Sequence, residues 1–161
     1  MYYLYTMNYK PPLTYYNSVF IPKLKIALSY EREAQDRIIQ YLDGKYYLFS
    51  VSSNSNYDFE LSNMMKYEVK TDFKAVITGN IYIEFIQFGR PSGISITYSD
   101  FYIIIIPYPT SSLFLLIDVL ELQYLISIGS YRFIIQPTET NYYTGGCIFE
   151  LKELIKYCLI I

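Results

Sequence analysis

The sequence contains no histidine, and this absence excludes several kinds of chemistry. Ser-His-Asp and Cys-His nucleophiles, histidine general bases and histidine-ligated zinc sites all need an imidazole. The two cysteines, Cys147 and Cys158, lack the CxxC spacing of a zinc site and are too few for a disulfide framework. If the chain is an enzyme, its chemistry must depend on carboxylates, lysines, tyrosines or a bound metal.

Positive charge is also scarce, with 13 Lys and Arg residues against 15 Asp and Glu residues. The resulting pI of about 5.1 counts against a protein that coats nucleic acid without sequence preference. It counts less against a nuclease, because acidic metal ligands lower the pI and bound cations restore the attraction to phosphate.

Long uninterrupted apolar runs are missing as well. The most apolar stretch, residues 113–128, is broken by Asp118, Glu121 and Gln123, and the first residues lack the basic segment of a secretory signal. We therefore expect a cytoplasmic protein with no membrane partner, located in the host cell cytoplasm if the protein is viral.

The residues that are abundant favour a packed β-rich domain. Hydrophobic residues make up 52% of the chain, and the 21 Tyr and 10 Phe residues favour strands. An A+T-rich genome, as in many viruses, produces the same bias. The length of 161 residues predicts a single domain over residues 1–161.

Local patterns divide this domain into an N-terminal arm and a core. Residues 1–28 are rich in Tyr and Pro and predict an irregular arm with a short helix near 23–27, followed by core and closing elements over 29–161. Ser29 is expected to cap a helix that ends at Asp43-Gly44. The remaining expected elements are strands at 45–51, 57–61, 65–71, 80–88, 99–107 and 131–136, and helices at 112–127 and 150–159. This order predicts an α/β fold.

Three residues in the first strands combine acidic and basic groups at a spacing that suits metal chemistry. Residues two apart on a strand point to the same side, so Glu68 and Lys70 project together, and a hairpin can bring Asp58 beside them. Two carboxylates with open water positions suit Mg²⁺, or Mn²⁺, and a neighbouring lysine can stabilise a hydroxide and a phosphate.

These residues resemble the motif of the PD-(D/E)XK, or restriction-endonuclease-like, nuclease superfamily. The segments 67–72, 78–85, 91–94 and 97–102 are also similar to small phage and viral nucleases of this type. The resemblance covers about residues 29–106 and implies an αβββαβ core with a central mixed sheet flanked by helices. It assigns Asp58 and Glu68 as metal ligands and Lys70 as the catalytic lysine. Tyr57 stands where the family name has proline.

Other charged residues are candidates for outer parts of the site. Glu33 matches an acidic position that some members of the superfamily use as a further metal ligand, although a first-turn Glu also stabilises a helix. Glu84 interrupts an apolar strand and is expected either to assist catalysis or to lie on a wet sheet face. Three cations are candidates for nucleic-acid binding, against the alternative of ordinary solvated charge: Lys66, Lys74 and Arg90.

The leading hypothesis is therefore a Mg²⁺-dependent deoxyribonuclease, with RNA as an alternative substrate. A Holliday-junction resolvase of the same superfamily, acting as a homodimer, is a second hypothesis. A viral module that binds DNA or assists assembly without enzymatic activity is a third.

Overall fold

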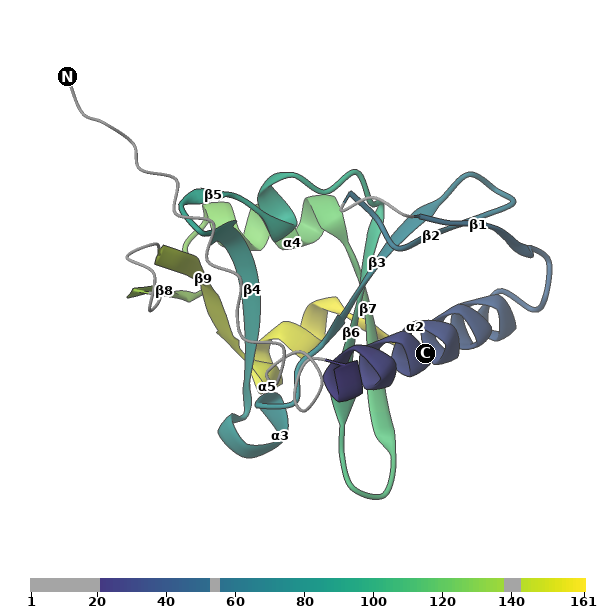
Figure 1. Cartoon of the computed structure of the whole chain (residues 1–161), viewed down its shortest axis with the longest axis horizontal. Coiled ribbons are helices and arrows are strands. Elements are labelled where there is room, and N and C mark those ends of the chain that lie inside the picture. Colours follow the sequence, from purple (N-terminus) through teal and green to yellow (C-terminus); the bar gives the residue numbers. More distant parts are fainter. Residues whose placement is uncertain (1–20, 53–55, 138–142) are drawn as a thin grey trace.

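The computed structural model describes residues 21–52, 56–137 and 143–161. Within them a long helix is followed by two β-sheets and several short helices (Figure 1). The helices are α2 (Ile21–Tyr41), α3 (Ala75–Thr78), α4 (Val119–Ser127) and α5 (Leu151–Leu154), with 3₁₀ turns at Gly93–Ser95 and Ile155–Tyr157. The strands are β1 (Leu48–Val51), β2 (Phe59–Leu61), β3 (Lys66–Thr71), β4 (Asn80–Gln87), β5 (Arg90–Pro91), β6 (Phe101–Pro107), β7 (Ser112–Asp118), β8 (Arg132–Pro137), β9 (Tyr143–Glu150) and β10 (Leu159–Ile160).

The larger sheet is mixed and has six strands in the order β1-β2-β3-β6-β7-β10. Strands β1, β2 and β3 pair antiparallel, whereas β3 and β6 pair parallel, with Glu68 opposite Tyr102 and Lys70 opposite Ile104. Parallel neighbours need a crossover connection, and the chain supplies it by forming α3, β4 and β5 away from this sheet. Strands β3 and β6 therefore lie side by side in its centre.

The smaller sheet is antiparallel and has the order β5-β4-β9-β8. Glycines allow its central pair to pack closely. A Cβ atom on Gly146 would lie 2.4 Å from the Tyr82 ring and 2.5 Å from the Ile83 carbonyl oxygen, so the ring lies across β9 only because this residue is glycine. The smaller sheet thereby presents an aromatic ring on one face.

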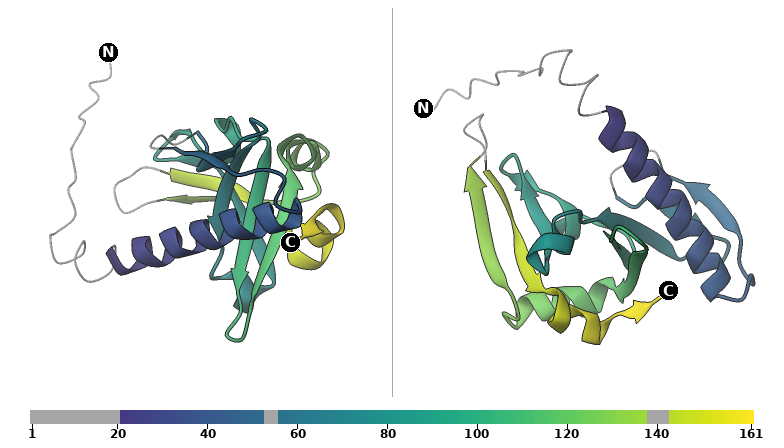
Figure 2. Two further views of the ribbon diagram at one scale, coloured as in Figure 1. Left: turned by 90° about the vertical axis from the view of Figure 1, so that its right-hand side faces the viewer. Right: turned by 90° about the horizontal axis from the view of Figure 1, so that it is seen from below.

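Two apolar clusters cover the two faces of the larger sheet. One packs against α2 and includes Ala34, Ile38, Phe59, Val69, Ile103 and Phe114. The other joins the opposite face to residues of β4, β9, α4 and α5, and includes Ile83, Ile104, Leu115, Leu122, Phe149 and Leu154. Because side chains alternate along a strand, Val69 faces α2 while Glu68 and Lys70 face away from it. Figure 2 shows α2 and the smaller sheet on different sides of the larger sheet.

Most expected strands are confirmed, but the start of the first helix is wrong. Helix α2 begins at Ile21 rather than at Ser29, so residues 21–28 are helical and not part of an irregular arm, while the arm expected over residues 1–20 lies outside the described part. The Ser29 hydroxyl donates to the Ile26 carbonyl oxygen at 2.7 Å and does not cap the helix. Pro22 lies in the first turn of α2, where proline is well tolerated.

The expected helix over 112–127 is also wrong in its first half. Residues 112–118 form β7, and helix α4 begins only at Val119, where the Asp118 carboxylate accepts hydrogen bonds from the amides of Leu120 and Glu121. A continuous apolar run fits a buried strand as well as a buried helix, and pairing with β6 and β10 decides for the strand.

The C-terminal part also departs from expectation. The helix expected at 150–159 is limited to α5, followed by a 3₁₀ turn and β10. Strand β9 and the separate smaller sheet were not anticipated. The structure is thus mixed α/β, with one six-stranded mixed sheet and few helices. In the described ranges, no helix combines the length and apolar character needed to cross a membrane.

Candidate active site

The structure brings Asp58, Glu68 and Lys70 together at the junction of β2 and β3. Asp58 directly precedes β2, and its amide donates to the Tyr67 carbonyl oxygen at 2.8 Å. Its carboxylate accepts a hydrogen bond of 2.6 Å from the Val69 amide, which fixes it beside the Glu68 position. Lys70 Nζ lies 2.6 Å from Glu68 Oε1. All three side chains line one cleft of about 1170 Å³.

Burial governs the protonation of the two carboxylates. Glu68 is only 6% exposed, and burial raises its pKa, with Lys70 opposing the shift and Asp58 adding to it. Burial also raises the pKa of Asp58, against the Val69 amide and Lys70. For Lys70, burial lowers the pKa, but Glu68, then Asp58 and Glu84, outweigh that effect and the net pKa is raised. The cluster therefore holds costly negative charge that attracts cations.

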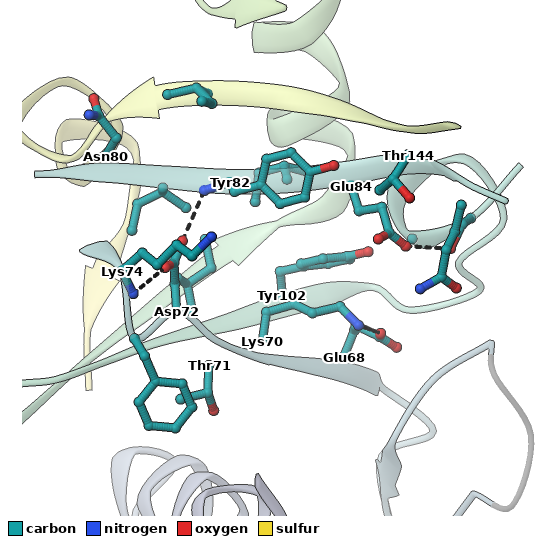
Figure 3. A pocket seen from close by; sticks show the side chains of 18 of the residues that line it. Glu68, Lys70, Thr71, Asp72, Lys74, Asn80, Tyr82, Glu84, Tyr102 and Thr144 are labelled. Atoms are coloured by element: carbon teal, nitrogen blue, oxygen red, sulfur yellow. Dashed lines mark hydrogen bonds and ion pairs between the residues drawn. The ribbon is translucent and has the colours of Figure 1, made fainter. Parts of the chain in front are cut away.

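Glu84 faces this cluster from the other side of the cleft. It lies on β4, and its Oε1 accepts a hydrogen bond of 2.6 Å from the Ser92 hydroxyl. Its charge contributes to the raised pKa of Lys70. Figure 3 shows Glu84 and Tyr82 on one wall and Glu68 and Lys70 on the other, with Tyr102 between them. Glu84 thus lines the same cleft as the three central residues, and its role in catalysis stays a prediction.

Tyr102 was not among the main candidates, yet it lies next to Glu68 across the β3–β6 pair. It is 1% exposed, and its hydroxyl forms no hydrogen bond of normal geometry with any residue in the described part of the chain. Burial, then the charge of Glu68, raises its pKa, while the nearby Thr97 hydroxyl lowers it. A buried hydroxyl without a partner is unfavourable, and Tyr102 is part of the lining of the cleft.

On α2, the acidic residue near the cluster is Glu31 rather than Glu33. Glu33 forms an ion pair of 3.1 Å with Arg37, whose guanidinium also lies 4.1 Å from the centre of the Phe114 ring. Burial, followed by the charges of Asp58 and Glu68, raises the pKa of Glu31. Glu31 also shares the spacing of the buried residues Ala34 and Ile38, being three and seven positions before them. This helical spacing was the signal that could have identified it.

The three cations proposed to bind nucleic acid lie in different places. Lys74 lines the cleft. Lys66 lies at the start of β3 with its ammonium 5.1 Å from the centre of the Tyr57 ring, and Arg90 is exposed on β5; neither lines the cleft. Arg132 of β8 does line it and was not expected. No local pattern identifies Arg132, because its place depends on the pairing of β8 with β9.

Asp72 connects the two walls. Its Oδ1 accepts hydrogen bonds from the amides of Lys74 and Ala75 at the start of α3, at 2.9 and 3.0 Å. Its Oδ2 accepts a hydrogen bond of 3.0 Å from the Tyr82 amide on β4. One carboxylate thus ties the end of β3 to the strand on the opposite wall, which sets the position of Tyr82 relative to Lys70.

The oxygen atoms of this site suit a hard divalent cation that takes its remaining ligands from outside the protein. The carboxylates of Asp58 and Glu68 supply oxygen, as Mg²⁺ and Mn²⁺ require. Across the ranges that the structure describes, no three His, Cys, Asp or Glu side chains are grouped closely enough to bind a metal by themselves.

Comparisons of the chain with protein-family models, with curated proteins and with solved structures find no match.

Proposed function

We propose that the protein is a metal-dependent nuclease that hydrolyses phosphodiester bonds of DNA. The observation that carries the proposal is the grouping of Asp58, Glu68 and Lys70 in one cleft, with Lys70 Nζ 2.6 Å from Glu68 Oε1. Glu68 is buried and Asp58 is half-buried beside a charged lysine, and this grouping is unfavourable for folding alone because desolvation opposes all three charges. Binding of a metal ion and of a phosphate would explain why these three charged side chains are grouped in the cleft.

The order of elements supports a PD-(D/E)XK-like core. Helix α2 is followed by the antiparallel strands β1, β2 and β3, and then, after the crossover, by β6 parallel to β3. Asp58 adjoins the second strand and Glu68-Val69-Lys70 lies on the third, as in the motif of that superfamily. The second helix of such a core corresponds here to the four-residue α3 together with the inserted β4 and β5.

The side chains divide the work of hydrolysis. A divalent cation at Asp58 and Glu68 would lower the pKa of a bound water and neutralise charge on the phosphate. Lys70, held charged by its carboxylate neighbours, can stabilise an attacking hydroxide and the negative charge that develops on phosphorus oxygens. The unpaired hydroxyl of Tyr102 can donate a hydrogen bond to one of those oxygens.

The test is incubation of the purified full-length chain with linear, circular and four-way-junction DNA, in Mg²⁺, in Mn²⁺ and in EDTA. We expect cleavage only with a divalent cation. Glu68→Gln should abolish cleavage without changing the circular dichroism spectrum. Glu60→Gln is the matched control, because Glu60 lies on the neighbouring strand β2 but does not line the cleft.

Full cleavage by Glu68→Gln would overturn the proposal. A strong preference for the four-way junction would favour the resolvase hypothesis. Absence of both cleavage and metal binding in calorimetry would favour a DNA-binding or assembly module without enzymatic activity.

A further inference from the structure

The wall of the cleft opposite the carboxylates has a surface suited to nucleotide bases. Tyr82 projects from β4 into the cleft, with its ring lying across Gly146 of β9 and 36% of the residue exposed. The amide of the same residue is held by Asp72 at 3.0 Å. This hydrogen bond positions the backbone of Tyr82, and its side chain lies on the wall opposite the one that carries Lys70 (Figure 3). Exposed aromatic faces of this kind stack on bases without reading their sequence.

A second aromatic ring lines the same cleft. Phe73 follows the end of β3 and is 50% exposed, and its ring contacts that of Tyr30 on α2 at a centroid distance of 6.2 Å. The cleft thus has one partly exposed ring on β4 and another beyond β3, with the carboxylate cluster in the same space. Stacked bases would cover both of these partly exposed rings.

The cations that line the cleft can neutralise only a few phosphates. Among the described residues that line it, the cations are Lys70, Lys74 and Arg132, and Lys70 is engaged by Glu68. Four carboxylates line the same space: Asp58, Glu68, Asp72 and Glu84. Double-stranded DNA presents one negative charge per about 1.7 Å, and proteins that bind it firmly neutralise about 6 to 10 phosphates. Two uncommitted cations match two phosphates of a short strand.

The shape of the cleft points the same way. Its volume is about 1170 Å³, close to the upper range of about 300–1,000 Å³ for pockets that enclose one small molecule. The reacting groups also have Tyr82 and Glu84 opposite them, so a phosphodiester must enter between two walls. In a duplex one side of each strand is occupied by its complement.

We infer that the cleft binds a short single-stranded segment of DNA, with bases stacked on Tyr82 and Phe73 and phosphates beside Lys74 and Arg132. The inference deepens the proposed function and rests on it for the position of the bond that is cut. According to this inference, the substrates are unpaired ends, flaps and gaps in DNA, and the interior of an intact duplex is not a substrate.

Binding is tested separately from cleavage, by fluorescence anisotropy of a labelled single strand and of the same strand annealed to its complement. Ca²⁺ replaces Mg²⁺, because it binds oxygen ligands without the octahedral geometry that Mg²⁺ imposes. We expect at least tenfold tighter binding of the single strand. Tyr82→Ala should weaken binding about tenfold and Tyr82→Phe should not, since a stacked base contributes about 1–3 kcal/mol. A labelled RNA strand in parallel shows whether the 2′-hydroxyl matters.

The salt dependence of the same measurement tests the two cations. Each phosphate contact to a single strand contributes about −0.7 to the slope of log affinity against log salt concentration. Lys74→Ala and Arg132→Ala should each make the slope less steep by about 0.7. Lys152→Ala, which removes an exposed cation paired with Glu150 outside the cleft, should leave it unchanged.

Cleavage then separates this inference from the proposed function. Degradation of the single strand and of single-stranded flaps, with the closed duplex circle intact, supports both. Cleavage of the closed circle at the same rate as the single strand overturns the inference and leaves the nuclease proposal standing. Preferential single-strand binding without cleavage in any metal supports the inference and overturns the nuclease proposal. Equal binding of single strand and duplex, or no effect of Tyr82→Ala, overturns the inference.

Discussion

Lys70 Nζ lies 2.6 Å from Glu68 Oε1, so the ammonium contacts the carboxylate that is proposed to hold the metal. A divalent cation at Glu68 would be repelled by this charge. We expect Lys70→Met to bind Mn²⁺ several times more tightly than the wild type, measured by isothermal titration calorimetry at pH 8. The same variant should cleave at least about 100-fold more slowly in single-turnover assays, because it lacks a donor to the transition state.

Lys66→Met is the matched control, since Lys66 lies on the same strand outside the cleft. Its metal affinity and cleavage rate should equal those of the wild type. Weaker metal binding by Lys70→Met would mean that the lysine maintains the carboxylates rather than competing with the cation.

Glu31 and Glu33 should differ sharply although they are two residues apart on α2. The charges of Asp58 and Glu68 act on Glu31, whereas Glu33 is paired with Arg37. We expect Glu31→Gln to lower metal affinity and cleavage about tenfold, as found for residues that support metal ligands. Glu33→Gln should leave both unchanged. A larger loss with Glu33→Gln, measured by the same calorimetry and cleavage assays, would restore Glu33 as the metal-site residue.

The central residues of the site could be predicted from the sequence because they lie close to one another along the chain. Glu68 and Lys70 share a face through the two-residue period of one strand, and Asp58 reaches them through one hairpin. Glu33 was predicted as a further metal ligand from the resemblance to the superfamily, with a first-turn role in a helix starting at Ser29 as the alternative. Once α2 begins at Ile21, Glu33 is far from the first turn, and the spacing from Ala34 and Ile38 selects Glu31.

The opposite wall could not be predicted in the same way. Tyr82, Arg132 and Thr144 meet the cleft only because β4, β9 and β8 pair with one another, and these strands are separated by up to about sixty residues of chain. Strand β7 illustrates the same limit, since its apolar run has no period that separates strand from helix. Long-range pairing supplies this information, and a single sequence does not display it.

Asp58 gives a prediction about stability and pH. Burial, opposed by the Val69 amide and Lys70, raises its pKa above the ordinary value of 3.8 in the folded protein. The folded state therefore binds a proton more readily than the unfolded chain, and stability falls as pH rises between the two pKa values. Asp58→Asn keeps an oxygen for the Val69 amide and removes the charge. In EDTA at pH 7 we expect it to unfold at higher denaturant concentration than the wild type.

The advantage of Asp58→Asn should shrink as the pH falls and should be lost below 3.8, where the wild-type carboxyl becomes protonated in both states. Asp36→Asn, on the exposed side of α2, should show no comparable gain at pH 7. Lower stability of Asp58→Asn across the whole pH range would show that the charged form of Asp58 supports the fold.

Substitution of Tyr102 tests whether its hydroxyl acts in catalysis or supports the fold. Its hydroxyl is buried without a well-formed hydrogen bond, which costs about 1–3 kcal/mol, so Tyr102→Phe should unfold at the same denaturant concentration as the wild type or a higher one. If the hydroxyl donates to a phosphate oxygen, the same variant should cleave about tenfold more slowly, a loss of about 1.4 kcal/mol, with unchanged metal affinity. Tyr67→Phe removes a hydroxyl from the α2 face of β3 and should leave cleavage unaltered. Wild-type cleavage by Tyr102→Phe would remove the hydroxyl from the mechanism, and a clear loss of stability would show that it has a partner in the folded protein.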